Sequence, residues 1–429
     1  MFRTISNFMK VRDIRRKIVF TLLMLIVFRL GTFIPVPFTN KEAIDFMSQQ
    51  NVFGLLNTFG GGALKNFSIF AMGIMPYITA SIIMQLLQMD VVPKFAEWKK
   101  QGEMGRKKIA QVTRYATIVL AFIQAIALSI GFNTMANGML ISNSNIGTLL
   151  IIAVVLTSGT AFLMWLGEQI TANGVGNGIS IIIFSGIVAA IPNGAQQLYA
   201  QYFTNPGDEL FINIVIVALI LLVIVAVTVG VIFILQALRK IPIQYAKKMN
   251  NHTPVGGQST HLPLKVNAAG VIPVIFAVAF IMAPRTIANF FEGDTAATIE
   301  RIFDYTQPIG MVIYVVLIIA FTYFYTFVQV NPEQMAENLQ KQGGYIPGIR
   351  PGKKTEAYLT RVINRLTFVG AIFLAAVSVL PIVLGGIANL PQSIQIGGTS
   401  LLIVVGVALQ TMKQLESQLV KRHYKGFIR

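Results

Sequence analysis

The chain has 429 residues, of which 54% are hydrophobic and 12% charged, and its mean hydropathy is +0.67. This composition is typical of a polytopic membrane protein and excludes an ordinary soluble domain. The net charge of +17 is spread too thinly for a continuous nucleic-acid-binding face, and the absence of cysteine excludes disulfides, thiolate metal sites and cysteine nucleophiles.

The N-terminal segment places basic residues ahead of an apolar run from Ile18 to Ile34, as a signal peptide does. Pro35 and Pro37 follow this run, and no small-residue cleavage site does. The pattern therefore predicts a first transmembrane helix that is retained.

The segment from Gly60 to Leu87 is apolar, but glycine and proline interrupt it. Its first part, Ala63 to Phe70, spans only roughly 12 Å as a helix, far less than the ~30 Å hydrocarbon core. Gly73 and Pro76 follow before a second apolar run. Non-helical backbone at membrane depth is tolerated only inside protein or beside a watery cavity. The segment therefore predicts a re-entrant half-helix followed by a full span, next to a pathway.

Apolar runs of spanning length predict ten transmembrane helices. They lie near residues 18–36, 74–90, 112–132, 147–167, 178–195, 211–236, 266–284, 308–330, 366–385 and 396–414. Of the 34 lysines and arginines, 29 fall in five places, which are the N-terminal segment, the loops 91–114, 237–265 and 331–365, and the C-terminal tail. By the positive-inside rule, both termini and these loops are cytoplasmic. Two halves of five spans, residues 1–195 and 196–429, would then insert with opposite topology and meet at a site.

Signatures of enzymatic chemistry are missing from the sequence. The three histidines lie in cytoplasmic loops or the tail, and there is no phosphate-binding-loop motif. No series of acidic or histidine residues crosses the spans as a proton relay requires. Glu168 is interpreted as a charge at a helix end, and the glycines at 174–178 as a tight interhelical loop. The sequence thus argues against an enzyme, a metal or cofactor, and an ion-coupled pump.

Two isoleucine pairs share a spacing of four residues, Ile74 with Ile78 and Ile179 with Ile183. Each pair lies on one helical face, and ordinary packing explains most such pairs. These two pairs, however, directly follow the two glycine-rich breaks. Branched apolar side chains at that depth can form a ring that closes a pore.

Gln85 and Gln124 are uncharged polar residues within spans, where such groups usually bond across helices. From the residues alone, two functions stay open, a channel and a secondary transporter for a small solute. A transporter also uses inverted repeats and broken helices, but it needs a convergent polar site at mid-membrane. The apolar residues around the breaks argue against that site.

Five motifs, in order along the chain, resemble the SecY family, the channel subunits of the bacterial Sec protein-conducting translocon. They are SIFAMGIMPYITASIIMQLL (Ser68–Leu87), WLGEQITANGVGNGISIII (Trp165–Ile183), QSTHLPLKVNAAGVIPVIF (Gln258–Phe276), YIPGIRPGKKTEAYL (Tyr345–Leu359) and GGTSLLIVVGVAL (Gly397–Leu409). The resemblance covers essentially the whole chain.

The resemblance implies an all-α polytopic membrane protein, with ten transmembrane helices in two inverted five-helix halves around a central pore. It implies a channel that translocates unfolded secretory polypeptides across the bacterial cytoplasmic membrane and releases membrane segments sideways into the lipid. The implied partners are the SecE and SecG subunits, the SecA motor ATPase, the ribosome, unfolded preprotein, the signal peptide and membrane lipid. No cofactor is implied.

The resemblance also implies roles for individual residues. The pore ring would comprise Ile74, Ile78, Ile179, Ile183, Ile275 and Ile403. The re-entrant plug would include Gly60, Gly61, Gly62, Ala63, Leu64, Lys65, Asn66 and Phe67. The lateral gate would include Gln85 and Gln124. The motor or ribosome would dock on Arg350, Lys247 and Lys248, although the family's usual basic pair nearer the loop tip is replaced here by NNHTPVGG.

Overall fold

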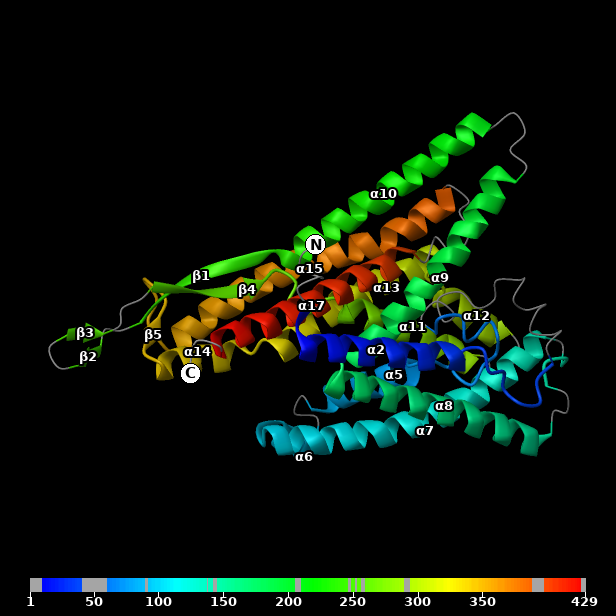
Figure 1. The fold of residues 1–429 in the computed structure, drawn as a ribbon, viewed down its shortest axis with the longest axis horizontal. Helices are drawn as coiled ribbons and strands as arrows, with labels where there is room; N and C mark the ends of the chain where they lie inside the picture. Colours follow the sequence, from blue (N-terminus) through cyan, green and yellow to red (C-terminus); the bar gives the residue numbers. More distant parts are fainter. Residues whose placement is uncertain are drawn as a thin grey trace.

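The computed structural model describes residues 10–40, 60–88, 92–136, 138–141, 145–204, 210–245, 248–250, 253–255, 259–288, 294–387 and 397–425. Helices dominate this part of the chain (Figure 1), as the sequence predicts. Each predicted span overlaps one helix. These helices are α2 (Arg12–Gly31), α5 (Met75–Leu87), α7 (Glu103–Met135), α8 (Ile146–Asn173), α9 (Gly178–Phe203), α10 (Leu210–Gln236), α11 (Ile272–Ala288), α13 (Pro308–Gln329), α15 (Lys353–Ile387) and α17 (Gly397–Lys425).

Within the described residues, six helices are long and apolar enough to cross a membrane, namely α7, α8, α9, α10, α13 and α15. α5 and α11 are apolar but shorter. Proline lies near the ends of two helices. Pro76 is in the first turn of α5, and α2 ends at Gly31, shortly before Pro35. α10 is 27 residues long, and only 6% of its apolar window is buried inside the protein. Figure 1 shows α10 extending away from the other helices.

The long helices pack in two groups. α2, α5, α7, α8 and α9 contact one another, and α10, α11, α13, α15 and α17 do the same. The groups meet on two sides, where α5 and α7 pack against α11, and where α9 packs against α10 and α17. The division at residue 195 falls inside α9, and the inverted relation of the halves stays a prediction.

Short strands, which the sequence analysis did not foresee, interrupt the helical fold in the loops predicted to be cytoplasmic. β1 (Leu238–Tyr245) pairs antiparallel with β4 (Ser259–Lys265) on one side and with β5 (Gly344–Tyr345) on the other. β2 (Lys248–Asn250) and β3 (Thr253–Val255) form a second small ribbon. In β1 the alternation of Ile241 and Ile243 with exposed neighbours gives the period of two that a half-buried strand requires.

Three short helices complete the described elements. α6 (Pro93–Lys100) precedes α7, α12 (Asp294–Ile302) precedes α13, and α14 (Pro332–Lys341) follows α13. Asn331 caps α14 by accepting hydrogen bonds from the amides of Glu333 and Gln334. α14 packs against α15 and β5, so it belongs to the same end of the molecule as the strands.

Residues 60–74 form consecutive turns, and the α-helix predicted to begin there is wrong for these residues. Gly61, Gly62 and Gly73 have φ of +66°, +88° and +56°, and Phe67 has φ of +41°. Such left-handed backbone cannot belong to a right-handed helix.

Candidate functional site

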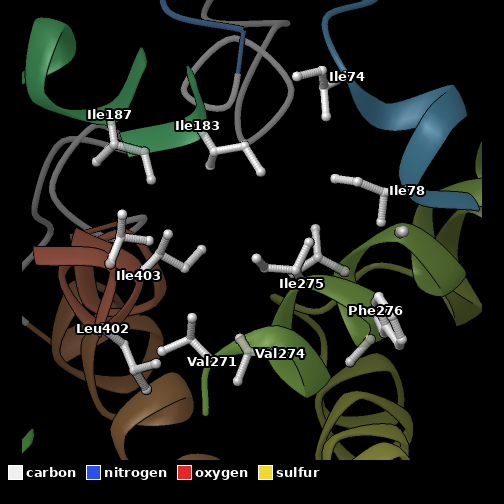
Figure 2. Close-up of a cluster of buried hydrophobic side chains, with 14 of the residues drawn as sticks. Ile74, Ile78, Ile183, Ile187, Val271, Val274, Ile275, Phe276, Leu402 and Ile403 are labelled. Carbon is white, nitrogen blue, oxygen red and sulfur yellow. The ribbon is translucent and has the colours of Figure 1, made fainter. Parts of the chain in front are cut away.

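Isoleucine side chains from four separate elements meet at the centre of the molecule (Figure 2). Ile74 precedes α5, Ile78 lies on α5, Ile183 on α9, Ile275 on α11 and Ile403 on α17. All five are between 0% and 7% exposed. The structure therefore brings together five of the six residues predicted for the pore ring.

The sixth predicted residue, Ile179, lies at the border of this cluster and is only half-buried. It packs toward α8, because a Cβ on Gly167 would lie 3.0 Å from its Cγ1. Ile187, one turn further along α9, is 3% exposed and joins the cluster instead (Figure 2). Ile187 was not among the residues predicted for the ring, although the spacing of four runs on from 179 to 183 to 187. We call Ile74, Ile78, Ile183, Ile187, Ile275 and Ile403 the isoleucine collar.

Further apolar side chains surround the collar. Val271, Val274, Phe276 and Leu402 lie beside it (Figure 2), and each is buried. Hydrocarbon side chains offer no hydrogen bonds, so this centre can exclude water and ions but cannot hold a polar solute. Among the described residues, no group of histidine, aspartate and glutamate side chains could hold a metal ion.

The turn between α8 and α9 positions Ile183 and Ile187. Asn177 caps α9, because its Oδ1 accepts hydrogen bonds from the amides of Ile179 (3.1 Å) and Ser180 (3.4 Å). A Cβ on Gly178 would lie 1.9 Å from the carbonyl oxygen of Gly167. The glycines of this stretch therefore allow two helices to approach closely, as the tight interhelical loop of the sequence analysis requires.

The turns at residues 60–70 dock against the end of α2. The amide of Val36 donates to the carbonyl of Phe67, and the amide of Ile69 donates to the carbonyl of Ile34, each at 3.0 Å. Asn66 Nδ2 donates to the carbonyl of Thr32 at 3.2 Å. Of the predicted plug residues, Ala63, Leu64 and Phe67 are buried, while Lys65 is exposed.

The two glutamines predicted for the lateral gate lie on α5 and α7, which pack together and which both contact α11. Gln85 Nε2 donates to Ser81 Oγ at 3.2 Å within its own helix, so this bond does not cross between helices as expected. Its Oε1 is buried and has no partner among the described residues. Gln124 is half-buried on α7. Their role in a gate stays a prediction.

Glu168 does not act as a charge at a helix end, which corrects the interpretation from sequence. It lies one turn before the C-terminus of α8, where the helix dipole disfavours a carboxylate. Instead its Oε1 accepts a hydrogen bond from Arg114 Nε at 2.7 Å, joining α8 to α7. Both side chains are partly exposed, so this ion pair contributes little to stability, about 0–1 kcal/mol.

The two loops predicted for docking form one folded unit. Ile241 and Ile243 of β1, Leu339 of α14 and Leu359 of α15 share a single buried cluster. Arg350 is exposed beside it, and its carbonyl accepts a hydrogen bond from Thr355 Oγ1 at 2.9 Å. Lys248 begins β2, while Lys247 lies outside the described residues.

Comparison with known proteins adds to this geometry. A family model for SecY matches residues 68–412. The chain belongs to the SecY family. It is 70% identical over 430 residues to the protein translocase subunit SecY of Bacillus subtilis strain 168 and 69% identical over 430 residues to that of Bacillus licheniformis, with all of both chains covered each time. It is 57% identical over 429 residues to the SecY subunit of Staphylococcus aureus strain NCTC 8325, covering 100% of this chain and 99% of that protein.

Solved structures share the fold of this SecY-family chain. One described as a protein-conducting channel has a TM-score of 0.63 at 20% identity and covers 95% of this chain and 93% of its own. Sec61 in the canine ribosome–channel complex has a TM-score of 0.58 at 19% identity and covers 95% and 93%. At these identities the similarity establishes a common architecture.

Proposed function

We propose that this chain is the channel subunit of a bacterial protein translocase, which conducts unfolded secretory polypeptides across the membrane. The observation that carries the proposal is the isoleucine collar, in which side chains from both groups of helices meet in one apolar cluster. The relatives of this chain are named protein translocase subunits, which agrees with that conclusion.

The collar explains how diverse polypeptides could pass without binding. An unfolded chain carries polar backbone and charged side chains, and hydrocarbon walls offer these groups no strong site. Isoleucine side chains close by van der Waals contact and separate again without breaking hydrogen bonds. A secondary transporter would need convergent polar groups here, and the side chains that converge are apolar. The driving energy would come from partners.

Lateral release would use the side where α5 and α7 meet α11. Parting these helices would open the interface between the two groups toward lipid, while the contacts of α9 with α10 and α17 remain as a hinge. A signal peptide or membrane segment, with its roughly 20 apolar residues, would leave there because it is more stable in lipid. Residues 60–67 would act as the plug below the collar.

The channel would work with partner proteins in the cytoplasmic membrane. The strand unit with Arg350 would dock the SecA motor or the ribosome, and SecE and SecG would brace the channel in the cytoplasmic membrane, with both termini on the cytoplasmic side. Two neighbours in fold, Sec61 and the yeast Ssh1 complex, are described in ribosome-bound assemblies. The positive-inside distribution of lysine and arginine supports this orientation.

Photo-crosslinking of an arrested secretory chain tests the channel function. A photoreactive residue at position 78, in the collar, should capture the arrested chain. The same residue at position 225 on α10, where Val225 is 61% exposed, should capture lipid. Capture at position 225 with none at position 78 would show that the polypeptide does not pass through the collar.

A further inference from the structure

Arg29 stands out because it opposes the charge bias of the chain. The basic residues of α2 gather in its first turns, at the end assigned to the cytoplasm, whereas Arg29 lies in its last turn. Its neighbours Ile26, Leu30 and Phe33 are 55%, 63% and 61% exposed, so the surface at this end of α2 is apolar. A charge among exposed apolar side chains is costly and needs a compensating contact.

The compensating contact is with the glycine segment, which we define as Gly60, Gly61 and Gly62. Arg29 Nη1 donates a hydrogen bond to the carbonyl oxygen of Gly61. The guanidinium also lies over the ring of Phe33, with 5.2 Å from Cζ to the ring centroid. Among the described residues, no carboxylate pairs with Arg29, so the Gly61 carbonyl is the acceptor that the structure gives it.

Gly61 also packs closely against α9. A Cβ on Gly61 would lie 3.0 Å from the Cα of Gly186, the residue before the collar residue Ile187. Gly61 also has φ of +66°, which favours glycine. It therefore contacts both the Arg29 guanidinium and α9, next to the collar.

We infer that Arg29 is a positioning residue that holds the glycine segment in its sealing position against α9. The inference rests on the channel function proposed above. A hydrogen bond from a guanidinium to a backbone carbonyl is strong and directional, so it can hold the segment in place. Because it is a single bond, it can break when the segment moves away from α9. The contact would thus set how often the resting channel opens, without touching the translocating polypeptide.

Ion conductance of the purified translocase in planar bilayers, without substrate, tests this inference. Arg29→Leu removes the donor and should raise the resting conductance about tenfold, as expected on loss of one charge-assisted hydrogen bond. Arg29→Lys keeps the charge and a donor on a slightly shorter side chain and should retain part of the seal. Arg301→Gln is the matched control, because it removes a charge from α12, a helix that packs on α11 and α13.

A labelling assay reports the position of the segment directly. Because the chain has no cysteine, Ala63→Cys introduces a single thiol at a position that is 0% exposed. An impermeant maleimide should modify it slowly in the parent and about tenfold faster with Arg29→Leu, in parallel with the conductance.

A double-mutant cycle with Gly61→Ala separates positioning from a general structural role. Both changes release the same contact, so the double variant should leak no more than the leakier single variant. Independent, multiplying effects would overturn the inference, as would unchanged conductance and labelling in Arg29→Leu. If Arg29→Leu does not fold, as judged by its thermal transition in detergent, the resting conductance of Arg29→Gln is compared with that of Arg29→Lys instead. Crosslinking at position 78 is unaffected by any of these results, so failure of the channel function would be seen separately.

Discussion

Isoleucine side chains in the collar are held by helices that belong to both groups, so each side chain seals against residues far away in the sequence. Ile403 of α17, for example, is 0% exposed and lies near Ile183 and Ile187 of α9 (Figure 2). A seal made of many small van der Waals contacts weakens when one member becomes small or polar. Substituting a collar residue should therefore weaken the seal more than substituting a neighbour on the same helix.

Ile183→Ser should raise resting ion conductance several-fold, because a shorter, hydrated side chain opens the collar to water. Ile179→Ser is the matched control on the same helix and should have a smaller effect, since Ile179 is only half-buried at the border of the cluster. Planar-bilayer recordings of both variants make the comparison. A larger leak from Ile179→Ser would return Ile179 to the ring and remove Ile183.

Sequence spacing identified half of the collar, and the reason is physical. Ile74, Ile78 and Ile183 directly follow helix breaks, and a break in a membrane helix is visible in sequence as glycine or proline. Ile275 and Ile403 belong to no pair of isoleucines four residues apart, and only the family resemblance singled them out. The pairing of Glu168 with Arg114 was missed because 54 positions separate them and no local pattern links them.

The packing of the helices that carry these residues depends on close approach at a few glycines. α8 and α9 are joined by the turn at 174–177, and they touch where Gly178 meets the backbone of Gly167. The long spans could be predicted because twenty apolar residues in a row have few alternatives. The turns at 60–74 and the strands of the loops could not, since left-handed residues and pairing between distant segments leave weak local signals.

Gly178→Ala should destabilise the protein by about 1–3 kcal/mol, because the new methyl group would overlap the carbonyl oxygen of Gly167 and push α8 from α9. Gly194→Ala on the same helix meets no atom within 4 Å and should be neutral or slightly stabilising. Thermal unfolding in detergent compares the two variants. Equal transition temperatures would show that α8 and α9 adjust without cost.

Arg350→Glu should impair docking of SecA while leaving the helices folded, because Arg350 is exposed and surface changes usually alter stability within about ±0.5 kcal/mol. The reversed charge would repel a carboxylate or phosphate that the guanidinium binds. Lys354→Glu makes the same charge change four residues away and should impair docking less. Normal SecA-driven transport by a well-expressed Arg350→Glu variant would refute this role.

At the scale of the whole molecule, two groups of helices meet over a centre that must open. They touch on one side through α5, α7 and α11 and on the other through α9, α10 and α17. Two groups that part at the centre would share less buried surface than a solid bundle, which is the reason to propose a brace. The brace must leave the α5–α11 side free if segments are to exit there.

Removing SecE should therefore lower the thermal stability and protease resistance of the purified channel. We expect the SecE helix to contact both groups on the side of α9, α10 and α17, where it can hold them together without closing the exit. Purification with and without SecE, followed by melting and limited proteolysis, measures the effect. Equal resistance in both preparations, or a SecE contact across α5 and α11, would contradict the role of SecE as a brace.

The length of α10 does not match the thickness of the membrane. Its 27 residues extend about 40 Å as a helix, whereas the hydrocarbon core is only ~30 Å thick. This chain buries only 6% of its apolar window, so most of its length is open to its surroundings. The mismatch must be relieved by tilting α10 or by thickening the lipid around it. We therefore expect the thickness of the bilayer to act on this helix and, through its contacts with α9 and α17, on the side of the channel that would bear the hinge.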